Sequence, residues 1–430
     1  MERRTGLART RRDRGQTQET LAHRLGVDVS SVARWERGTS TPSPRLRVAL
    51  ARELGLRLDE LACLLNGGER QPAACAPTDL ISDIWTATER DELVAQLATD
   101  VPAAPLPDGQ AVRVAHQWLI APPPPAVTEM RQSGRGIGRI GTDVIERIRA
   151  RLRYLREADD LIAGGDLHGT VRAELARTAN LLGDTTYTER TGRELLRAVA
   201  ELCQLAGWST ADASDNAAAE RYYLNGIRTA HAAGDLVLAA QIVSSLGYHM
   251  AETGGPARDA VLLTRSALAR MDNSDRPATA TPTVRALLHA RNAWTHAVAG
   301  DTRHAADEIQ RAQDEYSHRT DSDPDPTWAY WLTPEEMNII TGRVDTVLGR
   351  PLEAQQRLGP ALRHCDPRRL RETTLYTIWL AEAHLRAHDV DGARALATSA
   401  NRTRAVIRSA YSDRAVNRLT RQLVSLRDRH

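Results

Sequence analysis

One short stretch of the chain gathers side chains suited to hydrogen bonding with nucleic acid. Residues 17 to 38 read TQETLAHRLGVDVSSVARWERG. The pattern predicts two short helices joined by a tight turn, which is the unit that places a helix in the major groove of DNA. The exposed face of the second predicted helix carries Val29, Ser30, Ala33 and Arg34.

Capping residues define where these two helices begin and end. Thr17 is suited to the N-cap of the first helix, and Gly26 to the position just after its last turn. Asp28 takes the N-cap position of the second helix, and Gly38 ends it. The apolar side chains that this arrangement would bury are Leu21, Ala22, Leu25, Val32 and Trp35.

The pattern extends from about Leu7 to Leu65. It runs through LARTRRDRG, the two motif helices, a TPSP turn, RLRVALARELGL and LDELACLL. This stretch resembles the helix-turn-helix domain of the lambda-repressor-like (Xre) family, and the resemblance implies five helices that bind DNA. A generic small helical bundle is the alternative, but it would not need polar residues at the start of one particular helix.

The resemblance also implies a role for individual residues. Arg34 would donate two hydrogen bonds to a guanine, and Val29, which stands where relatives often have a long polar side chain, would contact a thymine methyl group. Arg11 and Glu36 match a pair that ties the first helix to the recognition helix. The residues implied to contact bases or phosphates are Gln18, Asp28, Val29, Ser30, Ser31, Arg34, Arg37 and Thr39.

Positive charge is concentrated at the N-terminal end. Residues 1 to 65 contain 13 arginines and 8 acidic residues, whereas the remainder contains 44 arginines and 47 acidic residues. Such an excess favours DNA binding, because it displaces counter-ions from the phosphates. The chain has no lysine, which suggests a GC-rich bacterial genome.

Other features of composition predict a cytoplasmic, nucleoid-associated protein. The N-terminus is charged and lacks the apolar run of a signal peptide, and no run of apolar residues is long enough to span a membrane. The cysteines show no CxxC spacing, which favours reduced, buried thiols. They are Cys63, Cys75, Cys203 and Cys365.

A connector is predicted between the DNA-binding domain, residues 1–66, and a long helical domain, residues 141–430. This connector, residues 67–140, contains two helical patterns, 79–99 and 110–120. It also contains the stiff spacer APPPP.

The segment GIGRIG, residues 136–141, matches GxGxxG, and Asp159 and Asp160 follow it. No strand precedes the glycines, so a linker is favoured over a dinucleotide site, and no cofactor is expected.

From residue 142 onward the pattern predicts successive helical pairs. Their internal turns are predicted at Gly254, Gly300, Gly349 and His388. Small residues recur seven positions before each turn, and again in the second helix of each pair at Ala260, Ala305, Ala354 and Ala393. The offsets resemble the tetratricopeptide (TPR) repeat, although the alanines are 45, 49 and 39 residues apart and the usual period is about 34.

A generic helical array is the alternative. Helices 142–163 and 166–183 would lead into the array, and 404–428 would cap it.

The resemblance to TPR domains implies a concave groove lined by the first helices of the pairs. Aromatic residues interleaved with polar groups suit a peptide or small-molecule pocket there, although packing between repeats is the alternative reading for any one of them. The candidate ligand-binding residues are Gln241, Ser244, Tyr248, Trp294, Trp328, Tyr330, Trp331, Arg343 and Glu382.

No pattern predicts a catalytic or metal centre. GxSxG, HExxH and GKS/T motifs are absent from the sequence, and the histidines lack metal-ligand spacing. His289 and His296 lie two turns apart on a predicted helix, which favours a helix surface. An enzyme hidden in residues 142–250 remains the weakest alternative.

Together these patterns predict a sequence-specific transcriptional regulator. It would bind an inverted repeat of double-stranded DNA as a homodimer, sense a peptide, small-molecule or protein ligand through its repeats, and not bind membranes. The architecture resembles regulators of GC-rich bacteria in which repeats sense a signal. The alternative is an adaptor, in which the repeats recruit a protein partner and the helix-turn-helix tethers it to DNA.

Overall fold

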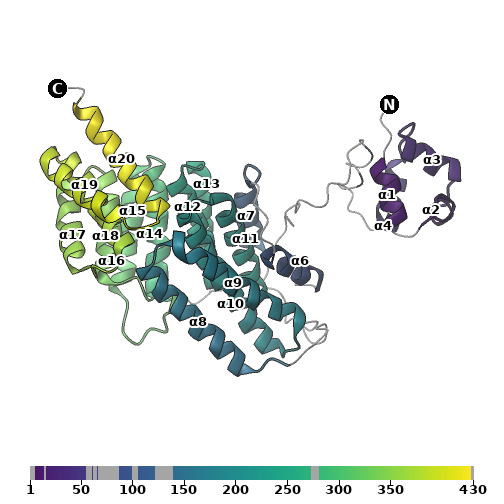
Figure 1. The fold of residues 1–430 in the computed structure, drawn as a ribbon, viewed down its shortest axis with the longest axis horizontal. Helices are drawn as coiled ribbons and strands as arrows, with labels where there is room; N and C mark the ends of the chain where they lie inside the picture. The colour runs from purple at the N-terminus through teal and green to yellow at the C-terminus, as the bar shows by residue number, and fades with distance from the viewer. Residues whose placement is uncertain are drawn as a thin grey trace. The chain divides into compact units, whose positions relative to one another are not determined.

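The computed structural model describes residues 5–13, 16–54, 61, 65, 87–98, 105–121, 139–272 and 280–427. The chain divides into two compact units, Met1–Asp79 and Leu80–His430, whose folds are shown in Figure 1. Among the described residues the elements are helices, apart from one isolated bridge between Arg139 and Thr186. The predicted all-α class is confirmed.

The first unit is a small helical bundle. Its described helices are α1 (Thr5–Asp13), α2 (Gln18–Leu25), α3 (Val29–Arg37) and α4 (Pro44–Leu54). One apolar cluster joins them, and Leu61 and Leu65 also belong to it. The fifth helix expected at 58–65 lies mostly outside the described residues.

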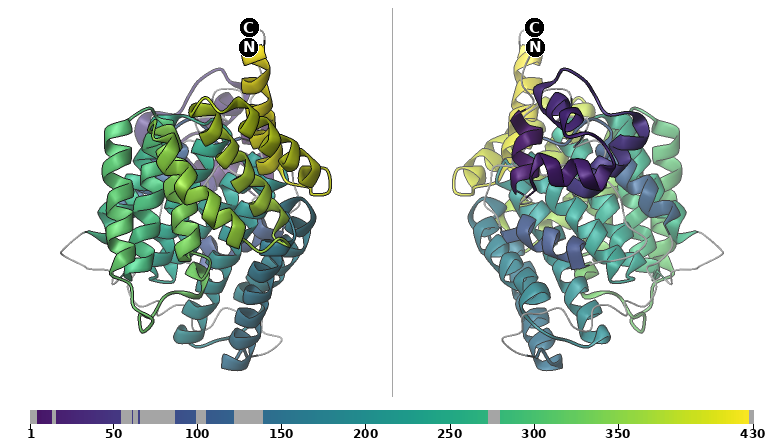
Figure 2. Two further views of the ribbon diagram at one scale, coloured as in Figure 1. Left: turned by 90° about the vertical axis from the view of Figure 1, so that its left-hand side faces the viewer. Right: turned by 90° about the vertical axis from the view of Figure 1, so that its right-hand side faces the viewer.

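The second unit is a long helical array (Figures 1 and 2). Its described helices are α6 (Ala87–Ala98), α7 (Gln110–Ile120), α8 (Thr142–Leu161), α9 (Gly164–Asp184), α10 (Glu189–Asp212), α11 (Asn216–Ala232), α12 (Leu236–Thr253), α13 (Ala257–Met271), α14 (Pro282–Val298), α15 (Thr302–Ser317), α16 (Pro334–Val347), α17 (Pro351–His364), α18 (Leu370–Arg386), α19 (Val390–Arg404) and α20 (Ala410–Arg427).

Sharp turns separate the two helices of each predicted pair. Gly254, Gly300 and Gly349 have φ of 78°, 79° and 77°, and His388 has φ of 63°. Glycine adopts this left-handed region without steric strain, which explains why it recurs at these turns. The expected turns of the pairs α12/α13, α14/α15, α16/α17 and α18/α19 are therefore confirmed.

Small residues lie where paired helices cross closely. A Cβ on Gly247 would come within 2.9 Å of the Ala260 carbonyl oxygen, and one on Gly342 within 2.8 Å of Leu358 Cγ. The alanines at the matching positions of the second helices are fully buried: Ala260, Ala305, Ala354 and Ala393. The array is thus repeat-like, while the closer likeness to TPR stays a prediction.

The two short helices expected in the connector belong to the second unit and pack against its other helices. α6 contacts α9, and α7 contacts α13. Trp118 of α7 is fully buried. Arg270 of α13 donates to the carbonyl oxygens of Leu119 and Ala121, at 2.7 and 2.8 Å.

The beginning and the end of the array are joined by hydrogen bonds. Asp212, at the end of α10, accepts from the Gly164 amide at 2.9 Å, the Ser409 hydroxyl at 2.6 Å and the Tyr411 amide at 3.1 Å. The Gly165 amide donates to the Arg408 carbonyl oxygen at 3.0 Å. These contacts hold the start of α9 against the start of α20.

Candidate functional site: a DNA interface and an aromatic cavity

The two motif helices begin and end where capping chemistry places them. The Thr17 hydroxyl accepts from the Thr20 amide at 3.1 Å. Gly26 and Gly38 follow α2 and α3 with φ of 62° and 78°. Asp28 occupies the N-cap position of α3, but its carboxylate makes no capping hydrogen bond, so it remains available to other donors.

One face of α3 is fixed in the core and the other is exposed. Val32 and Trp35 are buried against the apolar cluster of the first unit. Val29, an apolar side chain, has 37% of its surface exposed on the opposite face. The other exposed residues of the expected DNA-contacting set are Asp28, Ser30, Arg34, Arg37 and Thr39. A helix anchored on one side with polar groups on the other can enter a major groove.

Hydrogen bonds arrange the exposed side chains of α3. Arg34 Nη2 donates to the hydroxyl of half-buried Ser31 at 3.1 Å. The Thr39 hydroxyl donates to the Arg34 carbonyl oxygen at 3.1 Å, and Arg37 Nε donates to the Ala33 carbonyl oxygen at 3.2 Å. These contacts are local and weak, so the guanidinium groups can still reorient toward a base or a phosphate.

The expected pair between Arg11 and Glu36 is confirmed. Arg11 Nε donates to Glu36 Oε1 at 2.7 Å, with both side chains 9% exposed. Gln18 Nε2 donates to Glu36 Oε2 at 2.6 Å. Glu36 therefore holds α1, the first turn of α2 and α3 together. The amide nitrogen of Gln18 is engaged by this carboxylate rather than left free for DNA.

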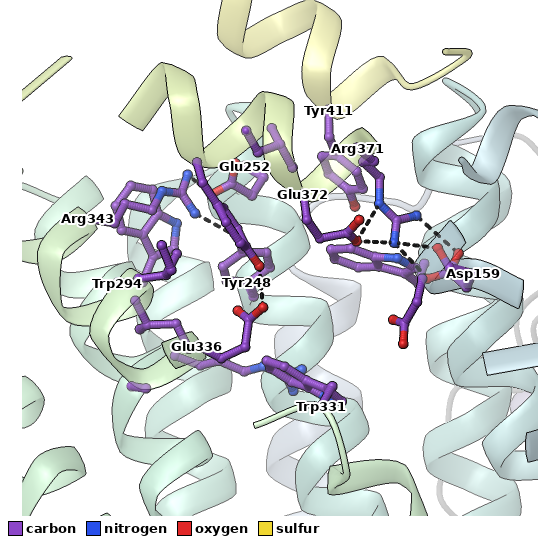
Figure 3. A pocket seen from close by; sticks show the side chains of 18 of the residues that line it. Asp159, Tyr248, Glu252, Trp294, Trp331, Glu336, Arg343, Arg371, Glu372 and Tyr411 are labelled. Carbon is purple, nitrogen blue, oxygen red and sulfur yellow. Dashed lines mark hydrogen bonds and ion pairs between the residues drawn. The ribbon is translucent and has the colours of Figure 1, made fainter. Parts of the chain in front are cut away.

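The second unit contains a cavity of about 220 Å³. Its wall holds five of the eight tryptophans and four of the nine tyrosines of the chain, so aromatic residues are concentrated there. Seven arginines and five carboxylates also line it. Figure 3 shows several of these side chains pointing toward one another from different helices. An aromatic wall with convergent polar groups is typical of small-molecule sites.

Arg343 forms a rigid part of this wall. Its guanidinium carbon lies 3.5 Å from the ring centroid of Trp294 and 4.1 Å from that of Trp379. It also donates to the Tyr248 hydroxyl at 2.8 Å and to Glu252 at 2.7 Å. Because stacking and charged hydrogen bonds restrain it on several sides, Arg343 holds α12, α14, α16 and α18 in register.

A second buried ion pair of the cavity wall links α8 and α18. Arg371 donates to both carboxylate oxygens of Asp159, at 3.1 and 3.0 Å, and to Glu372 at 2.6 Å. Burial raises the pKa of the Asp159 carboxyl, and the Arg371 charge opposes that rise. In a dinucleotide site of the GxGxxG type, an acidic residue in this position would bind the ribose. The Asp159 carboxylate is instead engaged by Arg371. Asp160 likewise pairs with Arg369 at 3.0 Å.

Glu336 is a buried carboxyl in the same wall. It accepts a hydrogen bond from the Tyr376 hydroxyl. Burial raises its pKa to about 7, against the opposing effects of Tyr376 and Arg369. Glu336 consequently changes charge near neutral pH.

The structure brings most of the candidate ligand-binding residues to one place. Ser244 and Glu382 are not among the residues of the cavity wall. The Ser244 hydroxyl accepts from Arg291, and Glu382 accepts from Arg418. The candidates in the wall are Gln241, Tyr248, Trp294, Trp328, Tyr330, Trp331 and Arg343.

Several wall residues were not predicted from the sequence. They come from α10, α18 and α20, outside the groove positions counted along the repeats. No local pattern identifies them, because the array must fold before they meet. They include Trp208, Arg371, Tyr376, Trp379, Tyr411 and Arg414.

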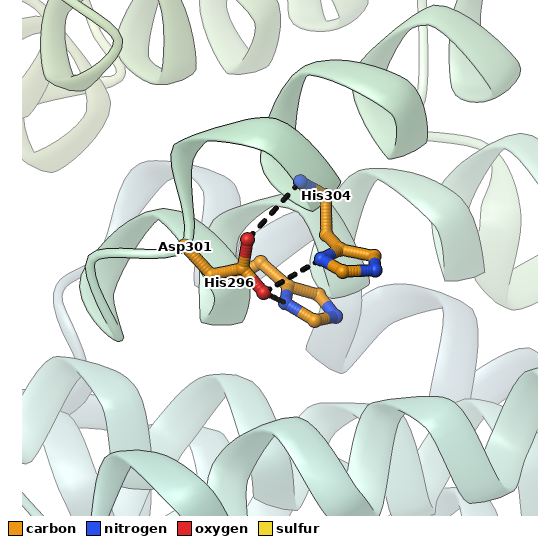
Figure 4. Close-up of side chains that lie close together, drawn as sticks. All are labelled: His296, Asp301 and His304. Atoms are coloured by element: carbon orange, nitrogen blue, oxygen red, sulfur yellow. Dashed lines mark hydrogen bonds and ion pairs between the residues drawn. The ribbon is translucent and has the colours of Figure 1, made fainter.

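The prediction that His289 and His296 lie on a helix surface is wrong, since both are buried. His289 Nδ1 lies 2.7 Å from Glu308 Oε2. His296 faces the loop between α14 and α15, where Asp301 Oδ2 lies 3.2 Å from its Nδ1 and 2.7 Å from that of His304 (Figure 4). Three ligand atoms within 4.8 Å of one another could in principle hold a metal ion. The Asp301 side chain also accepts from the His304 amide as the N-cap of α15, so helix capping explains its position.

Comparison with known proteins gives one match, which lies within the first unit. The model of a family described as Helix-turn-helix matches residues 7–61. No curated protein and no solved structure matches the chain. The matched family is one of DNA-binding regulators, which supports a DNA-binding transcriptional regulator and gives no support for an enzyme. Within the described residues, no helix is both long and apolar enough to cross a membrane.

Proposed function

We propose that the chain is a sequence-specific transcriptional regulator that responds to a ligand in the cavity of its helical unit. The exposed face of α3 supports the DNA-binding part of this proposal. Val29, Ser30 and Arg34 would meet base edges, and Ser31, Arg37 and Thr39 would contact the phosphate backbone. Binding as a homodimer to an inverted repeat follows from the two half-sites that such domains use.

The observation that carries ligand sensing is the cavity. Its wall includes residues from α8, such as Asp159, and from α20, such as Arg418. A wall drawn from both ends of the array would contact its occupant from several helices, which suits a small molecule or the end of a short peptide. An adaptor that recruits a folded protein would be better served by an open groove, so we favour sensing over the adaptor role.

Genome-wide occupancy of the tagged protein tests the DNA-binding part. We expect discrete peaks that share an inverted repeat, and we expect a variant carrying Ser30→Ala and Arg34→Ala to lose them. A wild-type profile that matches this variant would contradict sequence-specific binding.

Transcription from the occupied promoters tests sensing. Trp331→Ala removes an aromatic side chain from the cavity wall and leaves the first unit unchanged. We expect this variant to keep its peaks and to lose the signal-dependent change in transcript level. Unchanged regulation in the variant would contradict a role for the cavity.

A further inference from the structure

Charge pairing separates two arginines of the cavity from the other five. Those five each have a carboxylate partner: Arg156 pairs with Glu201, Arg343 with Glu252, Arg369 with Asp160, Arg371 with Asp159 and Arg418 with Glu382. Across the described ranges, no carboxylate is hydrogen-bonded or ion-paired with Arg291 or Arg414. The cavity wall therefore carries two guanidinium groups that no carboxylate of the described residues contacts.

Arg291 of α14 is held in place by neutral groups. Its Nη1 donates to the Gln241 carbonyl oxygen at 3.0 Å and to the Ser244 and Ser245 hydroxyls at 2.8 Å each. Burial lowers the pKa of Arg291 to about 10, so the side chain is still a cation at neutral pH. A cation removed from bulk water is destabilised unless an anion neutralises it.

Arg414 of α20 adds a second cation and an unmet hydrogen-bond donor. Its guanidinium carbon lies 4.8 Å from the ring centroid of Tyr411. Its Nη2 is buried without a hydrogen-bond partner, as are the Tyr411 hydroxyl and Gln241 Oε1. Buried polar atoms in native proteins find partners in protein, water or ligand. These three residues line the cavity, so a bound molecule is placed to supply partners.

Aromatic and aliphatic groups occupy other parts of the wall. The Trp208 ring stacks on Tyr411 with 4.9 Å between centroids and 27° between planes. Trp331, Leu287 and Ala290 also line the cavity, and Figure 3 shows Trp331 on the far side of Glu336 from Tyr248. Such surfaces suit a planar apolar body.

We propose that the cavity binds an organic anion, with the anionic oxygens held by Arg291 and Arg414 and a planar apolar body lying against the aromatic wall. The proposal rests on the proposed sensing role of the cavity and names the class of its ligand. Guanidinium groups bind oxyanions through paired hydrogen bonds. A free organic acid and the carboxyl end of a short peptide share this chemistry.

Two dyes with the same aromatic body test the proposal in the full-length protein. One is 1-anilinonaphthalene-8-sulfonate, which carries an anionic group, and the other is N-phenyl-1-naphthylamine, which does not. We expect Arg291→Gln and Arg414→Gln each to weaken binding of the sulfonate about tenfold, as the loss of a charged hydrogen bond predicts. Binding of the neutral dye should not change.

Control variants separate this role from folding. Arg258→Gln removes an exposed arginine of α13 outside the cavity wall and should leave both affinities unchanged. Arg291→Lys keeps the charge and should weaken sulfonate binding less than Arg291→Gln. Arg291→Gln removes three hydrogen bonds within the protein, whereas the Arg414 side chain makes none among the described residues, so Arg414→Gln is the cleaner variant.

Displacement of the sulfonate dye distinguishes the two sources of the anion. Stronger displacement by indole-3-propionate than by N-acetyl-Gly-Gly-Trp indicates a free acid, and the reverse order indicates a peptide end; both results support the proposal. If both Arg414→Gln and Arg291→Gln leave the affinity for the sulfonate unchanged, the proposal that the cavity binds an anion is wrong. If the neutral dye still binds in that case, the proposed sensing cavity itself stands. If neither dye binds, the proposed sensing site fails as well.

Discussion

The two candidate sites of this chain are built in opposite ways. The expected DNA-contacting side chains all lie between Gln18 and Thr39, on two short helices and the turns beside them. The cavity draws on residues from Arg156 to Arg418, and one ion pair of its wall, between Asp159 and Arg371, joins residues 212 apart in sequence. The first site depends on local capping and turn chemistry, whereas the second depends on how a whole array curves.

The largest expected effect comes from breaking the long-range pair. Arg371→Met leaves Asp159, Asp212 and Glu372 without the cation that they share. Removing one partner of a buried ion pair costs about 3–5 kcal/mol, so we expect the free energy of unfolding of the second unit to fall by about that amount. Urea unfolding followed by tryptophan fluorescence measures this. The control is Arg368→Met, whose side chain is 78% exposed. Equal stability of the two variants would show that the pair between Asp159 and Arg371 does not stabilise the second unit.

A smaller effect is expected where the ends of the array touch. A Cβ on Gly165 would lie 2.4 Å from the Arg408 carbonyl oxygen, whereas a Cβ on Gly169, in the same helix, would meet nothing within 4 Å. We expect Gly165→Ala to destabilise the second unit by about 3 kcal/mol through overpacking. Gly169→Ala should be neutral or slightly stabilising, because alanine favours helix. Thermal unfolding of both variants would show the difference, and a stable Gly165→Ala would argue against the contact.

The local site is expected to respond to single substitutions without any change in fold. Arg34→Ala should cost about 1–3 kcal/mol of binding to the operator if the guanidinium reads a base. Titration of operator and random DNA at one salt concentration measures this. Equal weakening on both DNAs would instead make Arg34 a phosphate contact. The stability of either unit should be unchanged, because Arg34 is exposed.

A further expected effect depends on pH. Burial raises the pKa of Glu336 to about 7. Tyr376 and Arg369 lower this pKa, whereas the charges of Glu372 and Asp160 raise it. Between about pH 4.5 and pH 7 the Glu336 carboxyl is therefore protonated in the folded protein and ionised in the unfolded chain. Its contribution to the free energy of unfolding falls as the pH rises through this range.

Glu336→Gln should remove that dependence. We expect the variant to be more stable than the wild type at pH 8, by about 3 kcal/mol, and to differ little at pH 4. Urea unfolding at both pH values measures this. A constant difference between the two proteins across pH would contradict a raised pKa.

The comparison also explains what the sequence can predict. Thr17, Gly26 and Gly38 predict the ends of the motif helices because capping and left-handed turns act over a few residues. Gly254 and His388 mark turns of the array for the same reason. Arg414 and Trp208 could not be placed in the cavity, because no local rule indicates which distant helix each one faces. The sequence pattern predicts His289 and His296 on a helix surface because histidine is polar. The structure buries both rings, because His289 lies against Glu308 and His296 against Asp301.

The contacts of Asp212 with Gly164, Ser409 and Tyr411 have a consequence for folding. An open helical array contacts only its neighbours, so it can fray from either end and begin folding anywhere. Here the ends meet, and loop closure across some two hundred residues slows the last step of folding. We expect the array from α8 to α20 to unfold as one cooperative block. During synthesis the cavity cannot form until α20 has left the ribosome, so the nascent chain would be unable to bind the proposed ligand before α20 is made.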